Sequence, residues 1–362
     1  MSVTSPRRAR LLGGATLLLA PLLVLTTPGV ADAAPTRDRA DAAAGWLGRQ
    51  LDSDTHLVIT TFDGTEYPDY GLTADVVLAL DAAGIGRRQA RRTTAALKRN
   101  VLAYTGGGDP AEFYAGSFAK LLLVAQAQSV PAREFGLSAR GHLLANLRSL
   151  ECGTPRRTDC SEADLGRFSD RSQFGDFSNA ITQSLALISL ERATSAGPSA
   201  ASVRYLRTQQ CANGSFPLTF GATKCVGSSD ATGFAVQALV SVGSATARAA
   251  AQDAGRWLRR RQNEDGSLSG NGSDNANSTA LAAQAFDALD FTKAGTDARG
   301  FLRSLQVRCG GPASLRGSVS YDKSGSGEPL RATSQAVPAL AAVTLADISG
   351  DGSRRGLPTL AC

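Results

Sequence analysis

The chain has 362 residues, of which 43% are hydrophobic, 6% aromatic and 19% charged, and its formal net charge is +6. The basic residues are mostly Arg, recur at equivalent positions of helical segments and are not interleaved with aromatic residues, so they predict a solvated outer face and no nucleic-acid surface. With two histidines and no Cys-x-x-Cys pair, the sequence predicts no metal site and no cofactor.

Residues 1–33 are typical of a secretory signal peptide. Arg7, Arg8 and Arg10 precede an apolar stretch over 11–25, and the small residues of 31–33 form an A-x-A cleavage site. Cleavage after Ala33 leaves residues 34–362 as a single domain with a net charge of about +4. No later segment has 18 uninterrupted apolar residues, so we expect a secreted, extracellular protein without stable membrane insertion.

Six cysteines fit an oxidising compartment. Three of them follow equivalent helical segments, and each has one unpaired successor in the chain. Sequence alone allows fifteen pairings. Equivalence between repeats favours Cys152–Cys160, Cys211–Cys225 and Cys309–Cys362.

A repeat of about 50 residues organises the rest of the chain. Each unit joins an Arg-rich amphipathic segment to an Ala-rich segment that is apolar or small nearly all round. The first kind predicts outer helices near 38–51, 87–103, 132–150, 199–210, 245–262 and 296–307. The second predicts inner helices near 71–83, 111–127, 176–192, 230–242, 277–289 and 331–346.

The two kinds of helix predict an all-α fold, an (α/α)6 toroid in which six outer helices surround six inner ones. In the outer segment 245–262, Trp257 and Leu258 oppose Arg256, Arg259 and Arg260, as in a helix buried on one side. An open solenoid is the alternative. A short alternating stretch, 318–321, is a candidate hairpin. Small residues at shared positions predict close approach of inner helices: Ala74, Gly116, Gly233, Ala280 and Ser334.

Two loops carry a second pattern. Gln210, Gly214 and Phe216 match Gln262, Gly266 and Leu268, and a looser match joins Phe62, Asp63 and Gly64 with Tyr67. The pattern resembles the Q…G-x-W repeat of the α/α-toroid superfamily, which includes squalene-hopene cyclases (terpenoid cyclases) and protein prenyltransferases. That resemblance implies that the Gln caps a helix end and an aromatic side chain packs beneath the Gly turn. Cobalamin carriers use the same toroid without catalysis.

The chemistry of the enzymes in that superfamily is missing here. No D-x-D-D acid occurs, and the nearest pattern, Asp52-Ser53-Asp54, follows an outer helix. The Asp, Cys and His zinc ligands of prenyltransferases and the Gly-Cys-Gly-Glu-Gln run of thioester domains are also absent from the sequence. The sequence therefore favours a protein without catalytic residues.

Polar residues near the starts of the inner helices are the candidate ligand-binding residues, because these starts surround one mouth of the barrel. Carboxylates there also serve as helix caps. Asp75 differs, since it lies one turn inside an apolar helix, where an unpaired charge is costly. We therefore expect it to face the cavity or to pair with an outer-helix Arg. Three glutamines inside inner helices are candidates to bind an amide or to join helices. The candidates are Tyr70, Asp75, Tyr114, Asp176, Asp230, Gln237, Asn277, Gln284 and Gln335.

Two enzymatic patterns are weaker. Ser117-x-x-Lys120, Ser273-Asp274-Asn275 and Lys323-Ser324-Gly325 follow the order of the penicillin-recognising serine enzymes, with very different spacing. A glycosidase needs a carboxylate pair and aromatic platforms for sugar rings. Trp46 and Trp257 both lie on predicted outer helices, where packing explains them.

The sequence thus predicts a secreted, non-catalytic toroid that binds a bulky small molecule at its mouth, and the resemblance to cobalamin carriers suggests a corrinoid. Those carriers add a small β-domain over the ligand, so here a partner chain would close the mouth. The alternatives are a terpene cyclase-like enzyme with Asp75 or Asp230 as its acid, and a protein-binding scaffold.

Overall fold

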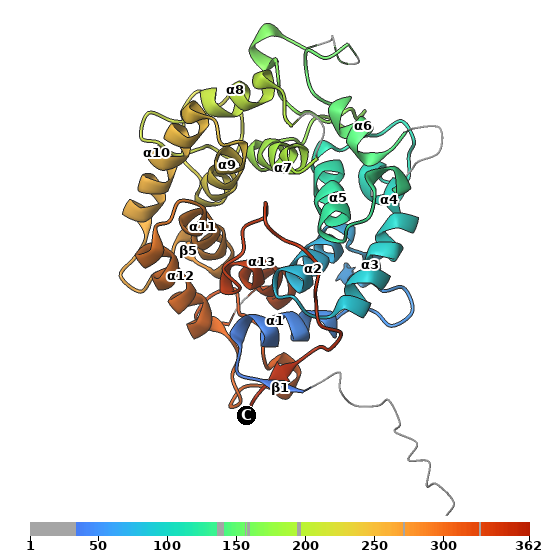
Figure 1. The fold of residues 1–362 in the computed structure, drawn as a ribbon, viewed down its shortest axis with the longest axis vertical. Helices are drawn as coiled ribbons and strands as arrows, with labels where there is room; N and C mark the ends of the chain where they lie inside the picture. Colours follow the sequence, from blue (N-terminus) through green and yellow to red (C-terminus); the bar gives the residue numbers. More distant parts are fainter. Residues whose placement is uncertain are drawn as a thin grey trace, which may run out of the picture.

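Six inner helices form a closed ring in the computed structural model, which describes residues 34–135, 141–155, 157, 160–193, 197–270, 272–325 and 327–362. The predicted signal peptide lies outside these residues. Each inner helix contacts the next, and the last contacts the first, so the ring is closed and no open solenoid forms (Figure 1). The inner helices are α2 (Tyr70–Ala82), α5 (Ala115–Ala127), α7 (Ala180–Glu191), α9 (Ser229–Val242), α11 (Ala276–Ala288) and α13 (Pro329–Leu340).

The outer layer follows the prediction with two exceptions. The segment predicted over 87–103 breaks at Asn100 into two helices, and only the ends of the segment predicted over 132–150 are helical among its described residues. The last inner helix also stops at Leu340, well before the predicted end at 346. The outer helices are α1 (Arg39–Gly48), α3 (Arg87–Arg99), α4 (Val101–Gly106), α6 (Leu143–Arg148), α8 (Ala200–Thr208), α10 (Ala245–Arg261) and α12 (Thr292–Leu305).

Side-chain caps start most of the inner helices. Asp69 accepts a hydrogen bond from the backbone of Leu72, and Asn179, Ser228 and Asn275 cap α7, α9 and α11 in the same way. The predicted close approach is confirmed at Gly233 of α9, where a Cβ atom would lie 3.0 Å from the backbone of Leu281 in α11. Small residues therefore allow the ring to close around a narrow axis.

The Gln–Gly pattern joins neighbouring outer helices. The Gln210 amide donates to the carbonyls of Gly214 and of Ala250 in α10, both at 2.8 Å. Gln262 repeats this arrangement with Gly266 and Ala294 of α12. Each Gly has a positive φ and its Cα packs against the next outer helix, where no Cβ fits.

A third copy of this arrangement closes the outer layer. The Gln306 amide donates to the carbonyls of Gly317 and Arg39, so the last repeat is tied to α1 at 2.9 Å. Gly317 also has a positive φ and packs against Ala42. The sequence prediction missed this copy because ten residues separate its Gln from its Gly.

Short strands lie in the loops. The looser match near residue 62 is wrong, because β2 (Ile59–Phe62) and β3 (Thr65–Pro68) form a hairpin on which Phe62 and Tyr67 are exposed. The expected hairpin over 318–321 is also wrong, since Val319 only bridges to Gln306. The other strands are β1 (Pro35–Thr36), parallel to β6 (Thr359–Leu360), and the pair β4 (Ser269–Gly270) and β5 (Ser273–Asp274).

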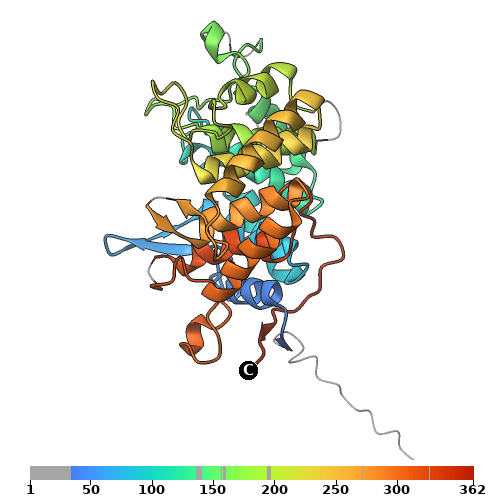
Figure 2. The same ribbon diagram turned by 90° about the vertical axis from the view of Figure 1, so that its left-hand side faces the viewer.

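The two ends of the toroid differ (Figure 2). We call the end at the starts of the inner helices the mouth, and both hairpins project from it. We call the opposite end the closed end, because the C-terminal segment, residues 341–362, runs across it (Figure 1). The three predicted disulfides are confirmed: Cys152–Cys160, Cys211–Cys225 and Cys309–Cys362.

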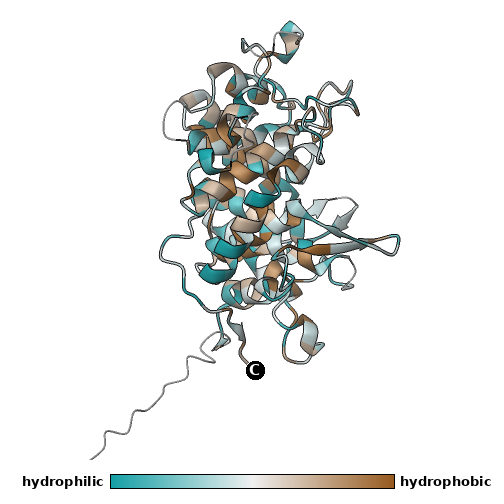
Figure 3. Ribbon diagram, turned by 90° about the vertical axis from the view of Figure 1, so that its right-hand side faces the viewer, coloured by the Kyte–Doolittle hydropathy of each residue, from teal (hydrophilic) through white to brown (hydrophobic). Residues whose placement is uncertain are grey.

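Figure 3 shows how hydropathy follows these two layers. Hydrophilic and hydrophobic residues alternate along the helices that face the viewer, as in helices buried on one side. The largest fully buried side chains include Phe118, Phe216 and Phe286. The core is therefore a ring between two helical layers and leaves the axis of the inner ring for a cavity.

Candidate functional site

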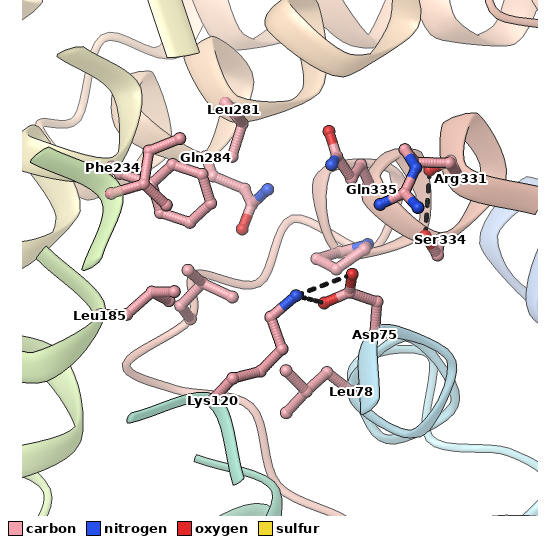
Figure 4. A pocket seen from close by; sticks show the side chains of 13 residues that line it. Asp75, Leu78, Lys120, Leu185, Phe234, Leu281, Gln284, Arg331, Ser334 and Gln335 are labelled. Carbon is pink, nitrogen blue, oxygen red and sulfur yellow. Dashed lines mark hydrogen bonds and ion pairs between the residues drawn. The ribbon is translucent and has the colours of Figure 1, made fainter. Parts of the chain in front are cut away.

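An axial cavity lies inside the inner ring, and every inner helix contributes to its wall (Figure 4). The sixth residue of each inner helix lines it, which follows from the equivalence of the six repeats. In helix order these residues are Asp75, Lys120, Leu185, Phe234, Leu281 and Ser334.

One half of the wall is polar and comes from the adjacent helices α13, α2 and α5. The Lys120 ammonium group lies 2.8 Å from the Asp75 carboxylate across the α2–α5 contact. Arg331 of α13 lines the same side and pairs with Asp69 at 3.3 Å. Ser334 donates to the Arg331 carbonyl at 3.0 Å.

The Lys120 side chain is a positively charged ammonium group in the cavity wall. Burial lowers the pKa of the Lys120 ammonium group, but the Asp75 carboxylate and the Tyr104 hydroxyl together outweigh burial and raise this pKa above its ordinary value. Among the described residues that line the cavity, Asp75 supplies the one carboxylate. The ion pair therefore holds the Asp75 carboxylate against Lys120 on the polar side of the wall.

The other half of the wall is apolar and comes from α7, α9 and α11. Ile181, Leu185, Phe234 and Leu281 lie there, with the side chain of Phe234 facing the cavity (Figure 4). Leu345 of the C-terminal segment adds to the wall from the closed end. The cavity thus has an apolar side and a charged side, which suits an amphipathic occupant.

Two glutamines in the wall have an unused acceptor. The Oε1 atoms of Gln284 and Gln335 are buried and accept no hydrogen bond within the described part of the chain. Gln284 is 2% exposed, and its amide nitrogen makes one long bond of 3.3 Å to the Ala280 carbonyl. A buried acceptor without a donor costs about 1–3 kcal/mol, so a ligand that donates a hydrogen bond there gains that free energy.

The size of the cavity limits what it encloses. Its volume is about 170 Å³, and a cavity of about 150 Å³ holds one benzene molecule. The enclosed part of a ligand is therefore about one ring or one short branched chain. A corrin macrocycle exceeds this volume and fits only outside, across the mouth.

The structure brings three of the predicted site residues, Asp75, Gln284 and Gln335, together in the cavity wall. The others lie elsewhere. Gln237 accepts from the Leu345 backbone at 3.0 Å and so holds the C-terminal segment. The remaining five lie at the starts of the inner helices: Tyr70, Tyr114, Asp176, Asp230 and Asn277.

Most of these five are engaged locally. Tyr70 donates to Asn100 at 3.4 Å, Tyr114 donates to Glu112 at 3.2 Å, and Asp176 pairs with Arg167. The Oδ1 atom of Asn277 is buried and has no partner among the described residues. These contacts favour structural roles for the three engaged residues.

Asp230 has a distinct environment. Burial raises its pKa above the ordinary value, and a hydrogen bond from the Ser278 hydroxyl at 2.6 Å opposes that rise. Asp230 precedes the cavity-lining Phe234 by one turn on α9. It therefore lies toward the mouth and is not part of the described cavity wall.

Sequence reasoning missed Lys120 as a partner of Asp75. The predicted shared positions align Gly116 with Ala74, which places Ser117 in register with Asp75. Helix α2 begins at Tyr70 and α5 at Ala115, so the observed register differs from the predicted one by three residues. Lys120 is identified as a cavity residue when positions are counted from the observed start of its helix, because the sixth residue of each inner helix lines the cavity.

No helix in the described residues is long and apolar enough to cross a bilayer. No group of three or more His, Cys, Asp or Glu residues among them is placed to hold a metal ion. The disulfides are typical of an oxidising compartment such as the extracellular space.

Comparisons with known proteins establish the fold. No family model and no curated protein sequence matches the chain. Solved structures do. The type II terpene cyclase MstE from Scytonema is similar with a TM-score of 0.57 and 14% identity over 84% of this chain and 96% of that one.

Two further structures have different functions or none stated. The unsaturated glucuronyl hydrolase of Bacillus sp. GL1, which degrades glycosaminoglycan, has a TM-score of 0.56 and 15% identity, covering 84% of this chain and 95% of that one. A protein from Actinoplanes has a TM-score of 0.53 and 17% identity over 84% and 99%. The protein described here is therefore an all-α, α/α-toroid protein with a terpenoid cyclase-like fold, and that fold serves more than one chemistry.

Proposed function

We propose that this protein is a non-catalytic toroid that binds a small amphipathic molecule in its axial cavity. The unused acceptor of Gln284 carries the proposal, because this residue is 2% exposed, its buried amide oxygen has no donor among the described residues, and it lines a cavity large enough for a ring. The apolar part of the ligand packs against Leu185, Phe234 and Leu281. Its donor group binds Gln284 and Gln335.

The polar half of the wall defines the rest of the ligand. Lys120 and Arg331 offer donors to an oxygen acceptor, and Asp75 offers a further acceptor. A molecule with one ring, one donor and one acceptor fits these groups, as in a primary aromatic amide. Such a ligand requires no chemistry from the wall, which is consistent with the missing motifs in the sequence.

A corrinoid would bind in a different way. The macrocycle would lie across the mouth, and only a side arm such as an acetamide would enter the cavity and reach the glutamines. Native mass spectrometry of the mature, oxidised protein with a corrinoid tests this proposal directly. A stoichiometric adduct would support a corrinoid as the ligand. No adduct at a high ligand concentration would exclude the corrinoid.

The cyclase-like alternative has weaker support. It rests on the shared fold with MstE, and it needs a protonated acid and walls that stabilise a carbocation. Asp75 is paired with Lys120, and Phe234 is the one aromatic residue among the described residues of the wall. Asp230 remains the better candidate acid. Turnover of a polyprenyl substrate that Asp230→Asn abolishes would establish this alternative.

Ligand-observed NMR with benzamide, benzyl alcohol, benzoate and benzene tests the binding proposal. We expect benzamide to bind most tightly and benzene about tenfold more weakly. The free energy of about one hydrogen bond to a buried acceptor corresponds to a tenfold change in Kd. Gln284→Leu with Gln335→Leu should remove this preference. Phe234→Trp should fill the cavity and abolish binding of all four probes.

A matched control is Gln209→Leu, a partly buried glutamine that ends the outer helix α8 and does not line the cavity, which should leave binding unchanged. Equal binding of benzene and benzamide to the natural protein would contradict the proposed role of the glutamines. Absence of binding by every probe would contradict the proposed function itself.

A further inference from the structure

The exposed apolar side chains of this protein gather at one end. Among the described residues, every large hydrophobic side chain that is exposed lies in three of the loops that lead from an outer to an inner helix, at the mouth. These side chains are Phe62, Tyr67, Leu165, Phe174, Phe177, Leu218 and Val226. Apolar patches of this kind mark interaction surfaces when polar residues surround them.

The first patch is the β2–β3 hairpin. Thr60 pairs with Tyr67 and Phe62 with Thr65, so Phe62 and Tyr67 lie on the same face of the hairpin. They are 78% and 51% exposed. The hairpin projects from the mouth away from the body of the toroid (Figure 2).

The second patch joins two loops. Phe174 and Phe177 lie before α7, and Leu218 lies before α9, where its carbonyl accepts from the Ala180 backbone at 3.0 Å. A bridge between residues 217 and 227 places Val226 beside Leu218. Both loops project at the same end as the hairpin (Figure 2).

The second patch is held in place by specific bonds. The Phe177 backbone donates to Asp170 at 3.1 Å, and the Asp170 backbone donates to Asp176 at 3.0 Å. The Cys211–Cys225 disulfide closes the loop that carries Leu218. The loops therefore fix these aromatic side chains in water, which costs free energy that a partner would recover.

The charge of the mouth differs from that of the whole chain. The chain has 38 Lys and Arg against 32 Asp and Glu. The loops that lead into the inner helices carry about twice as many acidic as basic residues, and the segments 59–69, 107–114 and 262–275 contain no Lys or Arg. The hairpin adds Asp63 in its turn, next to Phe62, and Glu66 on its opposite face.

We propose that the mouth docks a partner protein through a segment that combines basic and apolar residues. The aromatic side chains supply the contact area that dominates such interfaces, and the acidic loops attract the basic residues and steer them to the mouth. An anionic lipid surface is disfavoured, since the same carboxylates repel it. Docking would close the axial cavity, but the proposal does not depend on a ligand inside it.

Fluorescence anisotropy with three synthetic peptides of 18 residues tests this proposal. The first alternates Arg with Phe and Leu, the second replaces each Arg by Glu, and the third replaces each Phe and Leu by Ser. We expect the first to bind at least tenfold more tightly than the others and to weaken as salt increases. Hydrogen exchange should show protection of 59–68 and 172–178 in its complex.

Variants of the protein localise the effect. Phe174→Ser with Phe177→Ser should weaken binding at least tenfold, and Asp63→Asn with Glu66→Gln should reduce its salt dependence. Asp253→Asn with Asp297→Asn removes two exposed carboxylates from the outer helices and is the charge-matched control. It should leave binding unchanged.

Three results would overturn the proposal. One is equal affinity for the Arg and Glu peptides. The second is binding to phosphatidylglycerol vesicles that the Phe174→Ser and Phe177→Ser changes abolish, which would assign the mouth to lipid. The third is self-association in sedimentation experiments that the same changes abolish, which would make a second copy of this chain the occupant.

Discussion

The two ends of the toroid satisfy their helix termini in opposite ways. At the mouth, side chains of the chain's own caps accept from the first backbone N–H groups, as Asp69 and Asn179 do. At the closed end, the C-terminal segment supplies the partners. The Gly350 backbone donates to the Ala127 carbonyl at 2.7 Å, and the Arg354 backbone donates to Gly84 at 2.9 Å.

The same segment is itself held by inner-ring residues. Arg192, which follows α7, donates to the carbonyls of Leu345 and Ile348, both at 2.7 Å. Helix carbonyls at a C-terminus need such partners, and so do the first N–H groups, which at most of the inner helices are met in part by a side-chain cap. The C-terminal segment and the inner helices therefore stabilise each other at the closed end, whereas the loops at the mouth carry the docking surface proposed above.

The largest expected effect is loss of the disulfide that ties down the C-terminal segment. Cys309→Ser with Cys362→Ser opens a loop with a sequence separation of 53, and the chain-entropy model gives about 4 kcal/mol. The mouth disulfide, Cys211–Cys225, spans 14 residues and should contribute about 3 kcal/mol. Guanidinium unfolding of both double variants checks the order, and a larger loss at the mouth would contradict it.

The pH dependence of stability should come from the closed end, where Asp81 lies near the end of α2. Burial raises the pKa of Asp81 from about 3.8 to about 7, against a hydrogen bond from Gln128 and with a further rise from Asp351. Between these values the folded protein keeps a proton that the unfolded chain has released. The free energy of unfolding therefore falls as the pH increases from about 4 to 7 and stays lower above it.

Urea unfolding at pH 5, 6, 7 and 8 measures this loss, which we expect to be a few kcal/mol at most. Asp81→Asn should flatten the profile. Asp253→Asn, on an exposed outer helix, is the control and should leave the slope unchanged. An Asp81→Asn profile as steep as that of the natural protein would place the titrating group elsewhere.

The fold was predictable because its signals are local and repeated. The amphipathic pattern around Trp257 indicates an outer helix, and the apolar segment around Gly233 indicates an inner one. Because the pair recurs six times, an error at one helix does not change the predicted fold. The prediction was wrong where the chain departs from its repeat. Residues 341–346 continue the apolar pattern of α13, yet they leave the helix to cross the closed end, which a helical period cannot reveal.

The site was less predictable, because it depends on which residues face each other across the ring. Asp75 was recognised because an unpaired charge inside an apolar helix costs free energy. Gln284 and Gln335 were recognised because they are polar residues inside inner helices. Lys120 was missed, since a register error of three residues hides a pair that is 45 positions apart in sequence. Gln237 shows the converse, because a polar residue inside an inner helix binds the chain's own backbone.

The cavity lies between the two ends and should show an intermediate effect. Lys120→Met leaves the Asp75 carboxylate without its partner in a site where both side chains are about one-fifth exposed. We expect a loss of about 2 kcal/mol, below the values for fully buried pairs because water still reaches the site. The double variant with Asp75→Leu should recover most of it, and a double variant as unstable as the single one would show that the pair itself stabilises the ring.

The smallest effect should come from the mouth aromatics, although they are large side chains. Phe174 and Phe177 are 69% and 64% exposed, so Phe174→Ser with Phe177→Ser removes little buried area. The backbone bond from residue 177 to Asp170 survives in the serine variant. The free energy of unfolding should change by less than about 0.5 kcal/mol, as for other surface substitutions. A loss above about 1 kcal/mol would mean that these side chains stabilise the isolated protein, and the division between a stabilising closed end and a recognising mouth would then fail.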